Sequence, residues 1–219
     1  MGPDSKKYDG RWKMEDGRWR RIGTPSWTAS YNSFHLMETN MKWTLDTTHS
    51  AAEFAVKHLM ISTVKGRFNT FTGNGETNPD GTLKSAELTI EAASLNTNVD
   101  ARDNHLRSAD FFDVAKFPTI NFKSTKIEQK GTDVTITGDL TMHGETKPVT
   151  LKGELTAAVT DPWGNQRTAL AVTAKINRKD WGLQWNQALE AGGWAVGEDV
   201  KLSVEFEAVG VKTEVPVAA

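Results

Sequence analysis

The chain has 219 residues, of which 26 are Lys or Arg and 28 are Asp or Glu, and its formal net charge at pH 7 is −2. A balance so close to neutrality gives no electrostatic reason to expect nucleic acid or an anionic membrane surface as a partner. The absence of cysteine excludes disulfides and thiolate chemistry. No run approaches the ~20 apolar residues that a transmembrane helix needs. The first residues carry no apolar signal core, so we expect a cytoplasmic protein without stable membrane insertion.

The first forty residues differ from the rest of the chain. Two similar runs, YDGRWKM and EDGRWRR, flank Asp16-Gly17, and this arrangement predicts a short β-hairpin. The polar residues 22–40 then read as a linker. Two interpretations of this N-terminal extension stay open: an engineered leader or disordered tail, and a hairpin that docks on the domain or binds a partner. The expected organisation is an extension over 1–40, one domain over 41–212 and a tail over 213–219.

From residue 41 onward the chain alternates between apolar and polar side chains. The clearest case is Pro148 to Thr160, PVTLKGELTAAVT, whose period of two is typical of a half-buried antiparallel strand. The same period recurs over 42–46, 53–60, 64–72, 85–92, 119–127, 133–142, 168–177 and 199–208. About eight such strands predict an all-β fold, a closed antiparallel barrel able to hold one small or narrow ligand.

Several positions on the apolar faces carry very small residues: Ala86, Ala92, Gly138, Gly153, Ala157 and Ala174. Such residues either leave an elongated channel open or relieve crowding where strands coil and the barrel tapers. We expect a channel that accepts a long, thin apolar molecule. Its predicted wall consists of inward-facing residues: Phe54, Val56, Leu88, Ile90, Ile136, Gly138, Leu151, Gly153, Ala157, Val172 and Phe206.

One segment, residues 99–117, breaks the alternation and predicts a short helical insertion at the barrel mouth. Phe111 and Phe112 are expected to close that mouth over the ligand. Arg102, His105 and Arg107 are candidates for binding a phosphate-type head group beside the helix N-terminus. The aspartates interleaved with them indicate an alternative, a local ion-pair network, and both interpretations stay open.

Several motifs along the chain are characteristic of one family. They are DTTHS at 46–50, FAVKH at 54–58, RDNHLRS at 102–108, GDLTMHGETKPV at 138–149 and NRKDWG at 177–182. Over about residues 41–209 the chain resembles the YceI-like proteins. The resemblance implies a lipocalin-like, eight-stranded antiparallel barrel that binds polyisoprenoid chains such as quinones or isoprenyl phosphates. It brings no catalytic residues and no cofactor, and the missing secretion signal points to the cytosolic branch.

Four histidines, His49, His58, His105 and His143, lie within these motifs. None of them shows the i, i+4 spacing of a zinc protease, so we predict neither a metal site nor a catalytic centre. His58 shares the face of Phe54 and Val56. It is expected to be either a polar handle for the head group inside the barrel or a core histidine with an internal partner.

The favoured function is therefore a non-enzymatic one: the barrel carries, stores or sequesters a long apolar isoprenoid lipid. One alternative is a small hydrolase or isomerase that acts on a lipophilic substrate with His58 or His105 as its base. A second alternative is a binding module whose partner is recognised by the Trp-rich extension. The expected partner is the lipid itself, with no nucleic acid, and a homodimer is possible.

Overall fold

The computed structural model describes residues 12–16, 18–21, 40–190 and 192–211, which belong to two separate units, 1–37 and 38–219. In the first unit β1 (Trp12–Glu15) pairs antiparallel with β2 (Arg18–Arg21). Asp16, in the turn between them, has a φ of 55°. The predicted hairpin is therefore present. The linker and the tail over 213–219 lie outside the described residues, so their predicted boundaries stay predictions.

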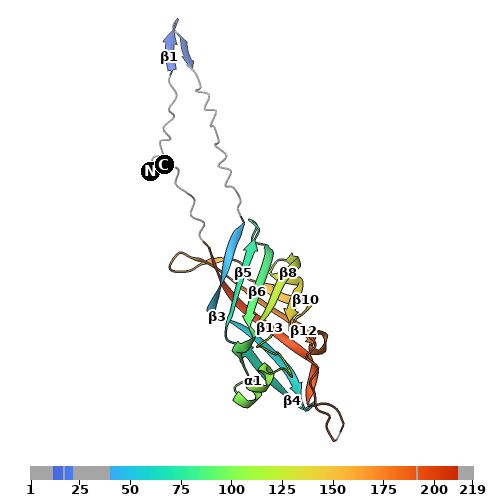
Figure 1. Ribbon diagram of the computed structural model, residues 1–219. Coiled ribbons are helices and arrows are strands. Elements are labelled where there is room, and N and C mark those ends of the chain that lie inside the picture. Colours follow the sequence, from blue (N-terminus) through green and yellow to red (C-terminus); the bar gives the residue numbers. More distant parts are fainter. Residues whose placement is uncertain (1–11, 17, 22–39, 191, 212–219) are drawn as a thin grey trace, which may run out of the picture. The chain divides into compact units, whose positions relative to one another are not determined.

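The second unit contains a closed barrel of eight antiparallel strands (Figure 1). Around the ring the strands follow the order β3, β5, β6, β8, β9, β10, β12 and β13, and β13 pairs back onto β3. Their bounds are β3 (Met41–His58), β5 (Phe71–Thr77), β6 (Leu83–Glu91), β8 (Thr119–Lys130), β9 (Asp133–Met142), β10 (Glu145–Leu155), β12 (Gln166–Asn177) and β13 (Val196–Gly210). The predicted fold class is confirmed.

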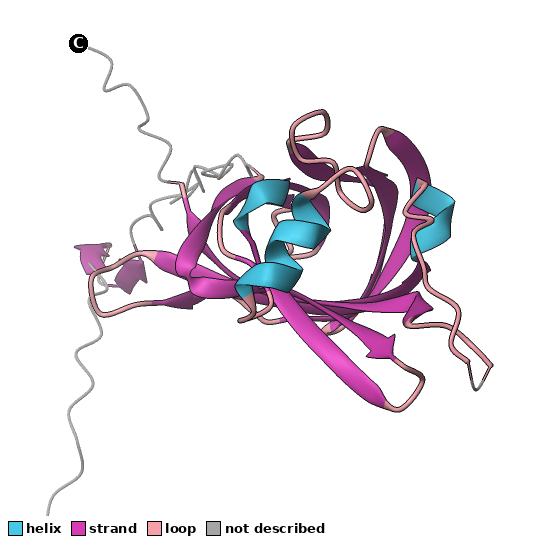
Figure 2. Cartoon of the chain, turned by 60° about the horizontal axis from the view of Figure 1, so that its bottom comes forward, coloured by secondary structure: helices cyan, strands magenta, loops and turns pink. Residues whose placement is uncertain are grey.

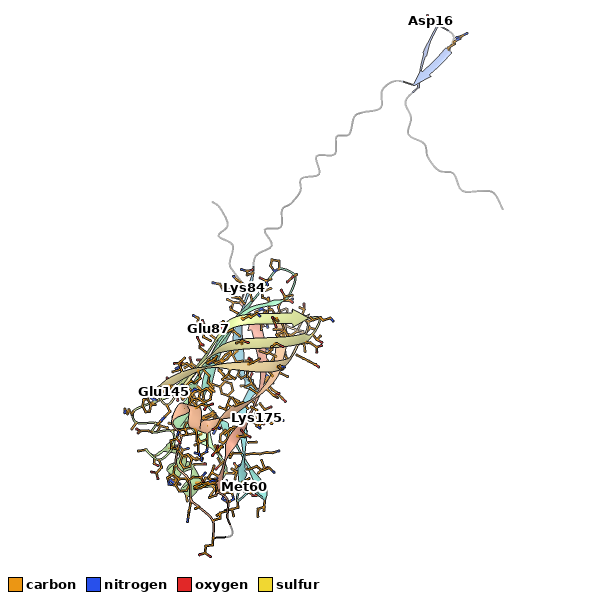
Figure 3. The ribbon with its side chains drawn as sticks, turned by 90° about the vertical axis from the view of Figure 1, so that its right-hand side faces the viewer. Asp16, Met60, Lys84, Glu87, Glu145 and Lys175 are labelled. Carbon is orange, nitrogen blue, oxygen red and sulfur yellow. The ribbon has the colours of Figure 1, made fainter. Side chains whose placement is uncertain are left out.

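One position of the ring is shared by two shorter strands. β4 (Ser62–Phe68) pairs with the second half of β3, and β5 pairs with the first half, so the two follow one another along the same neighbour. Lys84 and Met60 mark the opposite ends of this barrel in Figure 3. The apolar faces predicted from the alternation point inward, and Ile136 and Val172 are 1% and 2% exposed.

The first long strand differs from the prediction. Residues 42–46 and 53–60 were expected as separate strands, but β3 runs through both with a bulge between them. Asp46 pairs with Glu207 and Ala51 pairs with Glu205, so four residues of β3 lie opposite Phe206 alone. The hydroxyl of Ser50 stabilises the bulge, because it donates to the Asp46 carbonyl (2.6 Å) and accepts from the Glu207 N–H (3.0 Å).

The strand predicted over 148–160 is also interrupted. β10 ends at Leu155, and β11 (Val159–Thr160) is a separate short strand that pairs with β12. Between them the Thr156 hydroxyl accepts a hydrogen bond from the Ala169 N–H (2.8 Å). Ala157 is consequently exposed and outside any strand, so its predicted place on the inner wall is wrong.

The predicted helical insertion is present at one end of the barrel (Figure 2). It follows η1 (Ala92–Ser94) and β7 (Leu95–Asn96), and contains α1 (Asp100–Arg107). The buried Asp103 carboxylate accepts hydrogen bonds from the Thr97 N–H (2.9 Å) and hydroxyl (2.5 Å), which joins the helix to the segment before it. A second helical turn, η2 (Arg178–Trp181), follows β12 and ends at Gly182, whose φ is 74°.

Candidate ligand-binding cavity

The barrel encloses a cavity of about 180 Å³. A single buried water needs only ~10–15 Å³, so this space exceeds that requirement by roughly an order of magnitude. Every strand of the ring except β5 contributes to the wall, together with residues of the insertion. Ten of the predicted site residues lie on the wall: Phe54, Val56, Leu88, Ile90, Phe111, Phe112, Ile136, Leu151, Val172 and Phe206.

The wall of this cavity is almost wholly apolar. Glu53 and Glu87 border it, but their side chains are exposed on the outside of the barrel. Figure 3 labels Glu87 on the barrel, where its side chain is exposed. Arg178 is the exception: it borders the cavity and is only 3% exposed. An enclosed apolar space with very few polar groups is typical of sites that bind apolar small molecules.

The glycines predicted to widen the channel do not do so. A Cβ atom at Gly138 would lie 2.5 Å from the Lys123 carbonyl oxygen and equally close to the Phe122 ring. At Gly153 it would meet the Ala171 carbonyl. Both glycines therefore allow close packing of neighbouring strands, which was the alternative interpretation, and neither lines the cavity. Among the predicted small residues, Ala86 does lie on the wall.

A second, smaller cavity of about 60 Å³ is lined by residues such as Trp43, Leu83 and Leu155. It shares Ala86, Leu170 and Phe206 with the larger cavity. Leu170 and Phe206 are paired across β12 and β13, and the Phe206 ring also packs on Phe71, with 5.6 Å between ring centroids. These three shared residues, which we call the partition, separate the two cavities. The alternation alone marks Phe206 as inward-facing but does not distinguish it from other core aromatics.

The opposite end of the larger cavity is covered by the insertion. Phe111 and Phe112 lie on the wall there, and the Phe112 ring packs edge-on against Phe68. Phe111, His105 and Trp185 form an aromatic group, the mouth cluster, with centroid distances of 4.8–5.2 Å. The cluster joins the insertion to the loop that follows η2 at this end of the barrel, and Phe111 is its member on the cavity wall.

The predicted head-group residues have other partners. Arg102 donates to the Thr97 hydroxyl (2.7 Å) and carbonyl (2.9 Å), and Arg107 donates to the carbonyls of Ala93 (2.8 Å) and Leu95 (2.5 Å). His105 Nε2 lies 2.9 Å from an Asp110 carboxylate oxygen. None of the three lines the cavity, so head-group binding is not supported. Of the predicted ion-pair network only the contact of His105 with Asp110 is present among the described residues, and the two arginines donate to uncharged oxygen atoms instead.

His58 does not reach the interior either. It is the last residue of β3, paired with Ser62 and Val196 at the tip of the barrel, and it is absent from the cavity wall. The predicted polar handle at this position is therefore wrong. The alternative, a core histidine with an internal partner, is not seen either, because no hydrogen bond of the His58 ring is found among the described residues. Arg178, which sequence reasoning missed, takes a polar place on the wall. The sequence did contain a signal for Arg178, because it falls on the same alternate positions as Val172 and Ile176, whose side chains face the cavity.

A family model described as a YceI-like domain matches residues 43–208. The chain belongs to the YceI-like family. A UPF0312 protein of Staphylococcus aureus is 43% identical over 168 residues, which cover 75% of this chain and 95% of that protein. The crystal structure of a Campylobacter jejuni YCEI protein is similar at 30% identity, with a TM-score of 0.62 and coverage of 71% of this chain and 90% of that one.

A further structural neighbour of this YceI-like protein is a polyisoprenoid binding domain from Saccharophagus degradans implicated in plant cell wall breakdown. At 18% identity and a TM-score of 0.55, with coverage of 77% of this chain and 98% of that domain, the likeness shows the shared fold. Within the described part of the YceI-like chain, no helix has the length and apolar character needed to cross a membrane.

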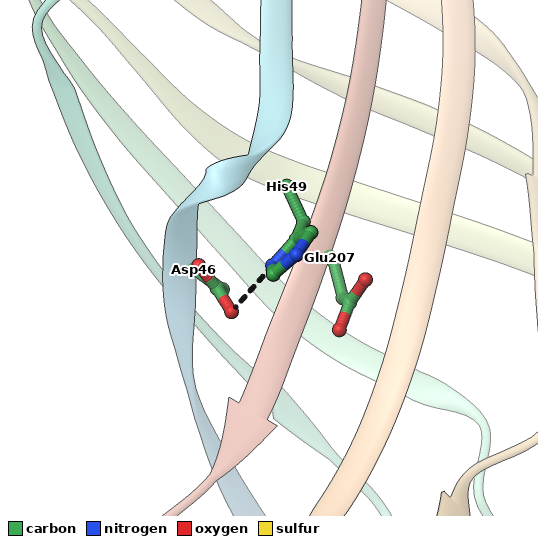
Figure 4. A group of neighbouring side chains, drawn as sticks. All are labelled: Asp46, His49 and Glu207. Atoms are coloured by element: carbon green, nitrogen blue, oxygen red, sulfur yellow. Dashed lines mark hydrogen bonds and ion pairs between the residues drawn. The ribbon is translucent and has the colours of Figure 1, made fainter.

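One cluster of potential metal ligands exists among the described residues of the YceI-like barrel: Asp46, His49 and Glu207 (Figure 4). His49 Nδ1 lies 3.0 Å from an Asp46 carboxylate oxygen. Arg167 Nη1 lies 2.9 Å from that same oxygen and 2.5 Å from a Glu207 oxygen, while its Nε contacts Asp161 at 2.9 Å. The guanidinium thus supplies the positive charge that faces these carboxylates, and the cluster acts as an ion-pair network that fixes the β3 bulge.

Hydrogen bonds and opposite charges in this network favour the ionised forms of Asp46, Asp161 and Arg167. Hydrogen bonds from Thr48, His49 and Arg167 hold the pKa of Asp46 well below its usual range. The hydrogen bond from Arg167 likewise lowers the pKa of Asp161, and the carboxylates in turn raise the pKa of Arg167. An opposite charge at hydrogen-bond distance stabilises the ionised forms of Asp46, Asp161 and Arg167.

Proposed function

We propose that this YceI-like protein binds a long apolar lipid of the polyisoprenoid type inside its barrel, for carriage, storage or sequestration. The observation that carries the proposal is the apolar cavity of about 180 Å³ inside the barrel, covered at one end by Phe111 and Phe112. Membership of the YceI-like family supports it, as does the polyisoprenoid binding domain among the structural neighbours.

Apolar contact alone is sufficient for tight binding. Drug-sized ligands gain ~0.3 kcal/mol per heavy atom, so a chain of about 40 carbons would gain ~12 kcal/mol when the barrel widens to bury its whole length. That free energy corresponds to a dissociation constant of about 1 nM. A carrier of this kind therefore needs few polar contacts, which agrees with the composition of the cavity wall.

A binding role is favoured over the alternative of a small hydrolase or isomerase. The two histidines considered as bases, His58 and His105, do not border the cavity, and His105 is engaged with Asp110. A base must lie within hydrogen-bond reach of the proton that it abstracts. A quinone or phosphate head group, a cytoplasmic location and a homodimer stay predictions within this proposal.

The first test is extraction of the natively purified, full-length protein with organic solvent, followed by mass spectrometry. We expect a long apolar molecule in stoichiometric amount, and uptake of prenyl lipids offered to lipid-depleted protein. A well-folded protein that is repeatedly empty and takes up no prenyl lipid would refute the proposal.

A matched pair of variants tests the location of the site. Ala86→Phe places a ring on the wall of both cavities, whereas Ala171→Phe places the same ring on the exposed face of β12. Lipid uptake should be lost in the first variant and retained in the second. Equal uptake by both variants, with both correctly folded, would show that the ligand does not enter the barrel.

A further inference from the structure

Arg178 is a charged side chain buried on the wall of an apolar cavity. It is the first residue of η2 and continues the inward-facing series of β12 that includes Val172 and Ile176. Its side chain is 3% exposed, which is rare for arginine, because a buried charge is costly unless it is paired.

The hydrogen bonds of Arg178 leave one of its nitrogens without a partner. Nε donates to the Gly197 carbonyl (3.0 Å), and Nη1 donates to the Leu183 carbonyl. Nη2 is buried and has no hydrogen-bond partner among the described residues. Buried donors of native proteins are nearly always satisfied by protein, water or ligand, so this nitrogen marks a place for an acceptor atom.

Within the part of the chain that the structure describes, no acidic side chain forms an ion pair with Arg178. Its two acceptors are neutral carbonyls, and the acidic side chain that interacts with it, Glu198, is bound to Lys179 at 2.5 Å and is 41% exposed. Burial lowers the pKa of the Arg178 guanidinium, and Glu198 only partly opposes this effect. An arginine nonetheless keeps its proton in proteins, so a positive charge remains at this end of the cavity.

We infer that Arg178 anchors the polar end of the bound lipid, with Nη2 donating to an oxygen of that group, and that an anionic oxygen is preferred to a neutral one. This inference rests on the proposed function. Carboxylate and phosphate share the required chemistry, since both offer a charged acceptor to a guanidinium.

The position of Arg178 suits an anchor for a long chain. Gly197, which accepts from Arg178, and Phe206 lie nine positions apart on β13. At ~3.3 Å per residue this separation is about 30 Å along the strand. A lipid held at Arg178 would therefore run from the η2 end of the larger cavity towards the partition. Leu183, which accepts from Nη1, also lies on the wall and encloses the same end.

The test compares ligands with one chain and different polar ends. Full-length wild-type protein carrying a fluorescent lipid is titrated with geranylgeranoic acid, its methyl ester, geranylgeraniol and geranylgeranyl phosphate, and displacement is measured. We expect the acid or the phosphate to bind at least tenfold more tightly than the ester and the alcohol, and the two anions tell which head group is preferred. Equal binding of all four overturns the inference and leaves the proposed function intact. Binding of none of them contradicts the proposed function itself.

Variants then assign the preference to Arg178. Arg178→Met should lose the preference for anions, so that the acid, the ester and the alcohol bind alike, whereas Arg178→Lys, which retains the charge, should keep part of it. Arg107→Met is the matched control, because Arg107 also donates to two backbone carbonyls but does not border the cavity. An anion preference that survives in Arg178→Met overturns the inference. If Arg178→Met does not fold, the inference is still tested by comparing the affinities for the acid and the ester in the wild type and in Arg178→Lys.

Discussion

The partition between the two cavities predicts how the protein measures the length of its ligand. Phe206, with Leu170 and Ala86, borders both the larger cavity of about 180 Å³ and the smaller one of about 60 Å³. Phe206→Ala removes the ring that separates them. The bound chain then gains access to a space one third as large as the one it already occupies, and we expect a preference for longer chains.

The size of this effect can be estimated. Each isoprene unit has five carbons and adds ~1.5 kcal/mol at ~0.3 kcal/mol per heavy atom. That increment corresponds to about tenfold in Kd. The Phe206→Ala variant should therefore bind a chain one unit longer than the wild-type optimum about tenfold more tightly than wild type does. Truncating a core phenylalanine costs ~3–5 kcal/mol of folding free energy, and the lower end applies here because Phe206 is only half-buried.

The assay measures Kd for prenyl alcohols of increasing length. Phe54→Ala is the control, since Phe54 is also half-buried but borders the larger cavity alone. The control should weaken or broaden binding without shifting the preferred length. The reasoning is refuted if the two variants, both folded, show the same length dependence as the wild type.

Three further predictions concern strand packing, acid stability and ligand exchange. Gly153→Ala should destabilise the fold by ~1–3 kcal/mol or more in urea unfolding, because the new Cβ would collide with the Ala171 carbonyl; an unchanged midpoint would contradict this. The pKa of Asp46 is lower in the folded than in the unfolded state, so its ionised form stabilises the fold above about pH 4, and this stabilisation is lost as the pH falls further towards the lowered value. Melting temperatures between about pH 7 and pH 2 should therefore fall less in Asp46→Asn than in the wild type, and parallel profiles would disprove the assignment. Trp185→Ala should speed lipid release in stopped-flow exchange by loosening the mouth cluster, and an unchanged rate would show that the ligand leaves elsewhere.

The alternation of side chains was sufficient to predict the barrel and most of its apolar wall. The alternation places Leu151 and Val172 on the inside, because successive residues of a strand point to opposite faces of the sheet. Parity does not say how much space a neighbour fills. Gly138 faces the interior in the pattern, yet the ring of Phe122 occupies the volume beside it, so no channel opens there.

Side-chain hydrogen bonds account for the other differences. The alternation continues past Leu155, but the hydroxyl of Thr156 takes a backbone hydrogen bond and ends the regular ladder, which leaves Ala157 outside. Arg178 was overlooked for the opposite reason. Its parity is inward, but a charged residue is normally expected at the surface, and only the structure shows that two backbone carbonyls hold it inside.

The ring is closed by the pairing of β3 with β13, the first and the last strands of the barrel. Contacts between segments so far apart in the sequence form slowly, because the intervening chain must be ordered before these contacts contribute to stability. The interior therefore does not exist during synthesis until the final strand has emerged. A lipid is either enclosed at the moment when β13 pairs with β3, or it must later enter past the mouth cluster. A chain that lacks β13 has an open sheet, whose apolar face and unpaired edges are exposed to neighbouring molecules.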